Sequence, residues 1–61
     1  MKYYVTLSGR DADGKIQEIV IASTKILGKA ITLAHNVDAT LPKVGGPVCF
    51  VMDESGDIID R

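Results

Sequence analysis

Cysteine and histidine each occur only once in this sequence, as Cys49 and His35. A single cysteine excludes a disulfide bond within the chain, and the spaced Cys and His residues of a structural zinc site are missing. No apolar run approaches the length of a membrane-spanning helix, which needs about 18 or more residues. The sequence therefore predicts no disulfide framework, no metal site and no membrane span.

An excess of charge of either sign is also missing. The 61 residues include 7 Lys and Arg against 8 Asp and Glu, which gives a formal net charge of −1. Nucleic-acid binding draws its phosphate affinity from a dense basic surface, which this balance does not supply. Because there is one cysteine and no apolar leader after Met1 and Lys2, we expect a reducing, cytoplasmic setting.

The composition is nevertheless that of a folded protein. With 46% hydrophobic and 25% charged side chains, residues 1–61 are expected to form a single small domain with one core. Cores of this size rarely supply more than about 3 to 5 kcal/mol of stability. Since neither a disulfide nor zinc is available, self-association is the remaining common source of added stability.

Two strands joined by a hairpin are predicted at the N-terminal end. Residues 2–8 alternate with a period of two, which is typical of a strand with one buried face. The side chains expected to face the core are Tyr3, Val5 and Leu7. Residues 15–22 return as a second strand rich in β-branched residues. Ile19 and Ile21 share one of its faces, whereas Ile16 and Val20 share the other, so both faces carry apolar groups.

A helix is predicted next. Ser23 or Thr24 offers a side-chain oxygen as a cap, and helical periodicity continues to about Asn36. At 100° per residue, one continuous apolar arc forms. Its members are Ile26, Leu27, Ala30, Ile31, Leu33, Ala34 and Val37. The opposite arc is polar and contains Lys25, Lys29, Thr32, His35 and Asn36. Gly28 also projects there. It is either a small residue that lets a partner chain approach closely or one tolerated in a helix held by packing, and we favour the second interpretation.

A loop and a second hairpin complete the chain. Pro42 and the pair Gly45-Gly46 disfavour regular structure between residues 37 and 46, where Leu41 and Val44 are expected to anchor the loop. Residues 48–52 and 57–60 are predicted as the third and fourth strands. In the third strand, the core-facing residues are expected to be Val48, Phe50 and Met52, which leaves Cys49 and Val51 on the outer face.

These elements predict an α+β fold with the order ββαββ. The third strand can pair antiparallel with the first strand or parallel with the second. Antiparallel pairing is the commoner choice in small sheets. We therefore favour a four-stranded, mainly antiparallel sheet in the order 2-1-3-4, with one helix packed across one face.

The two hairpins share an Asp-x-x-Gly turn phrase, which begins at Asp11 and again at Asp53. Short polar side chains and glycine recur in turns for chemical reasons, so independent use of good turn residues explains the repeat without a duplication. The first copy also matches the middle of a calcium-binding EF-hand loop. However, Gly9 and Val20 occupy the positions of the first ligand and of the bidentate glutamate, so two oxygen donors are missing.

No residue pattern indicates catalysis or a cofactor. His35 lies on the polar arc without an assignable nucleophile or orienting carboxylate. Cys49 lies inside an apolar strand, where a free cysteine usually behaves as a small hydrophobic residue. Gly45-Gly46 lacks the Lys and Ser or Thr of a phosphate-binding loop. We therefore expect no enzyme activity, no catalytic or metal-binding residues and no cofactor.

The face of the sheet opposite the helix is the predicted interaction surface. On the strand faces assigned above, its apolar residues are Tyr4, Ile16, Val20, Cys49 and Val51. A contiguous apolar patch on a small domain usually marks an interface, and the same patch on two copies suits a two-fold homodimer. A shift of one residue in register would exchange the faces.

Two classes of function remain. In the first, the protein is a small interaction module that is homodimeric or docks on a larger protein through its sheet face or an edge strand. In the second, it binds single-stranded nucleic acid on the open sheet, with a tyrosine stacking on bases. The carboxylates of Asp11, Asp13 and Glu18 would repel phosphates there, so the sequence favours the first class.

Overall fold

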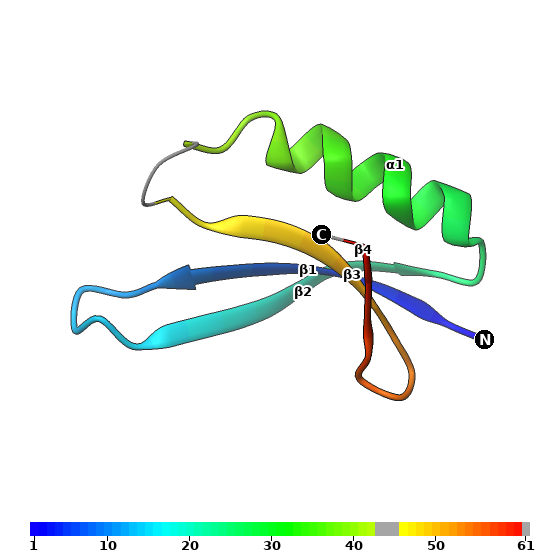
Figure 1. Ribbon diagram of the computed structural model, residues 1–61, viewed down its shortest axis with the longest axis horizontal. Helices are drawn as coiled ribbons and strands as arrows, with labels where there is room; N and C mark the ends of the chain where they lie inside the picture. Colours follow the sequence, from blue (N-terminus) through cyan, green and yellow to red (C-terminus); the bar gives the residue numbers. More distant parts are fainter. Residues whose placement is uncertain (43–45, 61) are drawn as a thin grey trace.

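The structure is a computed structural model that describes residues 1–42 and 46–60. Two strands, a helix and two further strands follow one another along the chain (Figure 1). They are β1 (Tyr3–Arg10), β2 (Ile16–Thr24), α1 (Leu27–Asp38), β3 (Val48–Asp53) and β4 (Ile58–Asp60). The predicted α+β class and ββαββ order are therefore confirmed, with element bounds that differ from the prediction by a few residues.

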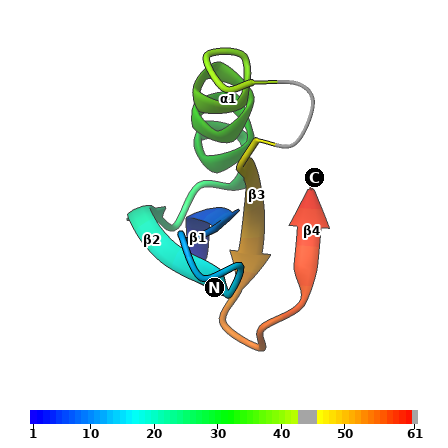
Figure 2. The ribbon, with the colours of Figure 1, turned by 90° about the vertical axis from the view of Figure 1, so that its left-hand side faces the viewer.

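The four strands form one antiparallel sheet in the order β2-β1-β3-β4, as predicted. Val5 of β1 lies opposite Ala22 of β2 and opposite Val51 of β3. The helix lies on one side of this sheet, and no described element lies on the other side (Figure 2).

The helix begins later than its polar residues suggested. Ser23 and Thr24 pair with Tyr4 and Tyr3 in the sheet, so β2 continues through the predicted capping positions. Thr24 Oγ1 accepts a hydrogen bond from the backbone N–H of Ile26 at 3.1 Å, which shapes the turn that enters the helix. Ile26 is the N-cap residue and makes no side-chain capping bond. Thr24 thus supplies a side-chain oxygen at the helix entry as predicted, but from a strand position two residues before the N-cap.

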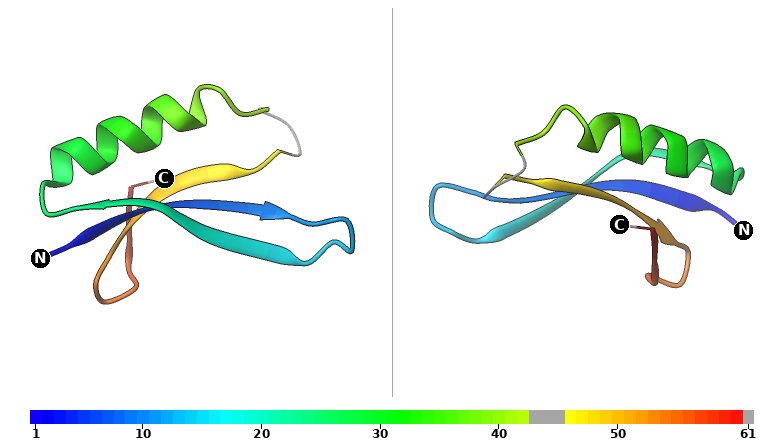
Figure 3. Two further views of the ribbon diagram at one scale, coloured as in Figure 1. Left: turned by 180° about the vertical axis from the view of Figure 1, so that it is seen from behind. Right: turned by 45° about the horizontal axis from the view of Figure 1, so that its top comes forward.

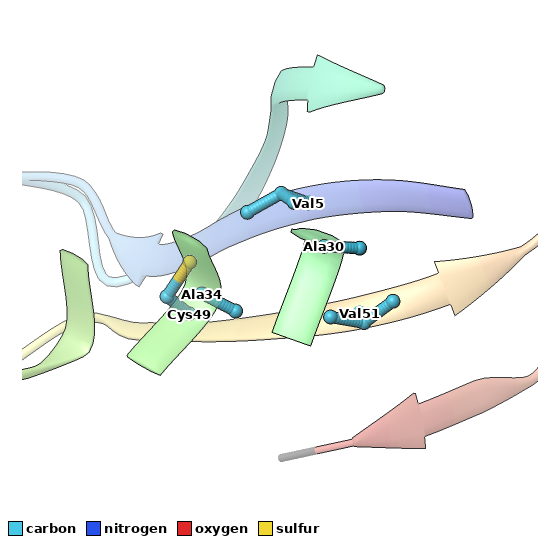
Figure 4. Packing of buried hydrophobic residues seen from close by; sticks show 5 residues of the cluster. All are labelled: Val5, Ala30, Ala34, Cys49 and Val51. Atoms are coloured by element: carbon cyan, nitrogen blue, oxygen red, sulfur yellow. The ribbon is translucent and has the colours of Figure 1, made fainter. Parts of the chain in front are cut away.

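The hydrophobic core lies between α1 and the two central strands, β1 and β3. Its buried members are Val5, Ala30, Ala34, Cys49 and Val51 (Figure 4). The two alanines present only methyl groups, which let the helix approach the sheet closely. Partly buried residues surround this cluster, namely Tyr3, Leu7, Ala22, Leu27, Ile31, Val37 and Leu41. Leu41 thus anchors the loop as predicted, whereas Val44 lies outside the described residues.

The predicted faces of β3 are reversed in the structure. Cys49 and Val51 face the helix and are 4% and 0% exposed, so neither belongs to an outer surface. The cause is the register with β1, which places Val51 opposite Val5. Directly opposed residues share a face of a sheet, and Val5 faces the core. The sequence could not reveal this, because all five residues from Val48 to Met52 are apolar and show no alternation.

Within the described residues, α1 is neither long enough nor apolar enough to cross a membrane.

Candidate interaction surface

The surface opposite the helix is defined by the register of the strands, and we call it the sheet face. Thr6 of β1 lies opposite Phe50 on one side and Val20 on the other. Because side chains alternate along a strand, the residues that share this face follow from these pairs. They are Tyr4, Thr6, Ser8 and Arg10 from β1, Ile16, Glu18, Val20 and Ser23 from β2, Val48, Phe50 and Met52 from β3, and Ile58 from β4.

The structure brings three of the five predicted interface residues together on the sheet face. Tyr4, Ile16 and Val20 lie there, whereas Cys49 and Val51 lie in the core. Reversal of β3 adds the apolar residues Val48, Phe50 and Met52, and Ile58 joins them because it is paired with Met52. The face is therefore more apolar than the sequence predicted. The sequence held no signal for this reversal, because residues 48–52 are all apolar and the register with β1 is a tertiary feature.

The middle of the sheet face is buried although no described element covers it. Phe50 is 5% exposed and Thr6 is 2% exposed. Strong twisting of the sheet allows the neighbouring strands to shield this pair, as the curved strands in Figure 3 illustrate. The Thr6 hydroxyl oxygen has no hydrogen-bond partner among the described residues. A buried hydroxyl of this kind costs free energy unless it is hydrogen-bonded.

Replacing Thr6 with valine is expected to stabilise the protein. Valine has nearly the same shape and removes the unpaired hydroxyl, so the free energy of unfolding should rise by about 1 to 2 kcal/mol. Urea denaturation followed by circular dichroism measures this change. Thr32→Val, at an exposed helix position, serves as the control with little effect. A lower stability of Thr6→Val would show that the hydroxyl has a partner in the folded protein.

Strand β2 is exposed on both of its faces. Ile16 and Val20 are 64% and 56% exposed on the sheet face. Ile19 lies opposite Leu7 on the helix side and is nevertheless 60% exposed. Ile21, which is the extra residue at an irregularity in the pairing, is 42% exposed. The helix runs along β1 and β3, while the hairpin end of β2 diverges from it (Figures 1 and 3).

The two turns that share the Asp-x-x-Gly phrase have the same hydrogen-bond geometry. Asp11 Oδ1 accepts hydrogen bonds from the backbone N–H groups of Asp13 and Lys15, at 2.9 and 3.0 Å. Asp53 Oδ1 does the same for the second and fourth residues after it, at 2.9 and 3.1 Å. Gly14 and Gly56 then take φ values of 80° and 86°, which glycine adopts without strain. The repeat is thus accounted for by turn chemistry.

The carboxylate of Asp11 is fully engaged in its own turn. Besides the two backbone N–H groups, Gln17 Nε2 donates a hydrogen bond to Asp11 Oδ2 at 3.1 Å. Among residues 1–42 and 46–60, no three His, Cys, Asp or Glu side chains lie close enough together to hold a metal ion. Asp11, which belongs to the stretch that matches a calcium loop, therefore has a structural role in the first turn.

These hydrogen bonds predict an unusually acidic Asp11. The backbone N–H of Lys15, followed by the side chain of Gln17, lowers the pKa of Asp11 below its ordinary value. Since the folded-state pKa lies below the unfolded value, the turn stabilises the fold above the ordinary aspartate pKa of about 3.9. This contribution is lost as the pH falls through the lowered pKa. An NMR titration of the side-chain carboxyl measures the shift, and Gln17→Ala should move the midpoint back towards the ordinary value.

The structure places Cys49 in the core and His35 on the surface of the helix. Burial, and then the charge of Asp38, raises the pKa of the Cys49 thiol. Asp38 also accepts a hydrogen bond from the Cys49 backbone N–H at 3.4 Å, so it fastens the end of the helix to β3. His35 lies exposed on the helix. The outer helix surface has only a shallow depression, lined by Gly28, Lys29, Thr32, Leu33 and Asn36.

The fold and its surfaces define a small ββαββ domain with an apolar, doubly exposed edge strand. Comparison with protein-family models, curated proteins and solved structures found no match to this chain.

Proposed function

We propose that this protein is a small, non-catalytic interaction module that works as a homodimer, with β2 and the adjoining part of the sheet face as its self-association surface. The supporting observation is the double exposure of β2. Four large branched side chains within six residues are solvent-exposed, namely Ile16, Ile19, Val20 and Ile21. A soluble monomer rarely leaves such a contiguous apolar patch uncovered.

The total surface area supports the same proposal. The chain exposes 4296 Å². A monomer of 6.5 kDa is expected to expose roughly 3,800 Å², so the excess is about 500 Å² per copy. If dimerisation buried this excess surface on both copies, the interface would bury about 1,000 Å² in total. That area is the lower limit for a specific protein interface. A dimer also supplies the stability that a core of five small and medium-sized residues lacks.

The chemistry of the described residues favours protein binding over the other functions. Phe50 shares the sheet face with Tyr4 but is buried, which leaves the half-buried Tyr4 as the aromatic ring of this face that bases could reach. On the same face the charge of Arg10 is offset by that of Glu18, so the strands do not supply the dense basic surface that phosphate binding needs. We therefore rank single-stranded nucleic-acid binding second. We place the protein in the cytoplasm. Its one cysteine, Cys49, is a free thiol in the core, and the fold uses no disulfide that would need an oxidising compartment.

The native mass of the protein tests the proposed function. Light scattering over a hundredfold dilution series should give twice the chain mass of 6.5 kDa at the concentrated end. A mass of one chain throughout, with cooperative unfolding, would contradict the homodimer. Titration of labelled single-stranded RNA at low salt tests the second candidate, and an absence of binding there would eliminate it.

A further inference from the structure

The outer edge of β2 carries unpaired backbone groups at every second residue. The Asp11 N–H donates to the Lys15 carbonyl oxygen at 3.0 Å, so Lys15 bonds inward, towards β1. Inward and outward bonding alternate along an antiparallel pair. Gln17 and Ile19 therefore also bond inward, whereas Ile16, Glu18 and Val20 direct their N–H and C=O groups to the free edge. No described strand lies beyond β2 on this side.

This edge has little of the protection that natural sheets use against pairing. Edge strands are usually short, or carry lysine, proline or an early bulge. β2 is nine residues long, and its regular part from Ile16 to Val20 contains neither lysine nor proline. Its one charged side chain is Glu18, and the irregularity at Ile21 comes only after the regular part. The other outer strand, β4, is three residues long.

We infer that the edge of β2 pairs antiparallel with β2 of a second copy, with the two-fold axis at Ile19. This inference rests on the proposed homodimer and specifies its geometry. The two sheets join into one continuous sheet, in which β2 becomes an interior strand. In an antiparallel two-fold pair, the helix-covered faces of the two copies join into one face of the combined sheet. Both helices therefore lie on the same face.

The double exposure of β2 favours edge pairing over face-to-face packing. Two copies packed through their sheet faces would cover Ile16 and Val20 but leave Ile19 exposed on the helix side. Edge pairing places a neighbouring strand beside residues on both faces. It also supplies partners for the outward N–H and C=O groups, which face packing leaves unpaired.

The position of the axis determines which side chains of the two copies lie opposite one another. An axis at Glu18 sets two carboxylates directly opposite each other, which is destabilising. An axis at Gln17 sets Ile19 and Val20 against the turn residues Lys15 and Gly14. An axis at Ile19 pairs this β-branched residue with its own copy and sets Glu18 opposite Val20. It also forms two hydrogen-bonded pairs, one on each side of the axis.

Cysteine substitutions at neighbouring positions test both the edge pairing and its register. At the axis, a residue and its copy have Cα atoms about 4.5 Å apart in a non-hydrogen-bonded pair, which is within reach of a disulfide. Gln17 lies two residues from the axis, so its copy is about 14 Å away along the strands and out of reach. Under mild oxidation, Ile19→Cys should therefore give roughly tenfold more covalent dimer than Gln17→Cys.

Two further proteins complete the experiment. The wild type, whose only thiol is the buried Cys49, gives the background level of covalent dimer. Glu18→Cys crosslinks efficiently only if the axis lies at Glu18. Strongest crosslinking at Gln17→Cys or Glu18→Cys would overturn the register. No crosslinking in a protein with dimeric mass would overturn edge pairing and leave the proposed homodimer standing. A monomeric mass would overturn both.

Discussion

Replacing Val51 with lysine is expected to unfold the protein. Val51 is 0% exposed and lies in the core against Val5 and the helix alanines. A lysine there either buries a charge without a partner, at a cost of several kcal/mol, or forces the helix off the sheet. A core of this size supplies only about 3 to 5 kcal/mol in total. Circular dichroism and the dispersion of the amide NMR signals should both report loss of the fold.

The matched control lies in the same strand. Val48 has the same side chain but is 49% exposed on the sheet face, so Val48→Lys should remain folded. The two substitutions therefore report which face of β3 meets the helix. A folded Val51→Lys together with an unfolded Val48→Lys would show that β3 is shifted by one residue, as the sequence pattern alone suggested.

Replacing Ile19 with lysine is expected to abolish self-association without unfolding the monomer. At 60% exposure the side chain contributes little to the core, so the monomer tolerates the change. Across the proposed two-fold axis, however, two lysines would stand directly opposite each other in place of two isoleucines. The loss of apolar burial and the like-charge repulsion should raise the dimer Kd about 100-fold, equivalent to about 2.7 kcal/mol. Sedimentation velocity measures this directly.

Ile58→Lys is the matched control for this prediction. Ile58 is also an exposed isoleucine, at 48%, but it lies in β4 at the opposite edge of the sheet. Edge pairing through β2 leaves Ile58 free, so the Kd should not change. Because Ile58 belongs to the sheet face, a dimer packed face to face would instead be weakened by Ile58→Lys as well.

Local patterns accounted for most of the fold. The alternation of Tyr3, Val5 and Leu7 identified the buried side of β1, and the two Asp-x-x-Gly phrases located both hairpins. The preference for antiparallel pairing gave the correct strand order. The alternation and the turns depend on residues close together in the sequence, whereas the strand order came from a general preference for antiparallel pairing and not from a local pattern.

The membership of the sheet face depended on long-range register and was predicted only in part. Tyr4, Ile16 and Val20 were placed correctly, because β1 and β2 are joined by a short hairpin that fixes their register. Cys49 and Val51 were misplaced, because an entirely apolar strand contains no signal for its own orientation. The helix start was missed for a similar reason. Thr24 is a good capping residue, but its pairing with Tyr3 is a tertiary contact that sequence propensity does not contain.

Hydrogen exchange of the β2 amides, followed by NMR at two protein concentrations, tests the central claim most directly. At high concentration, the amides of Ile16, Glu18 and Val20 should exchange slowly, because they face a second copy. On dilution below the dimer Kd they should exchange rapidly, while those of Gln17 and Ile19, bonded to β1, stay protected. If the three outward amides exchange equally fast at both concentrations, β2 is not a self-association edge and the account is contradicted.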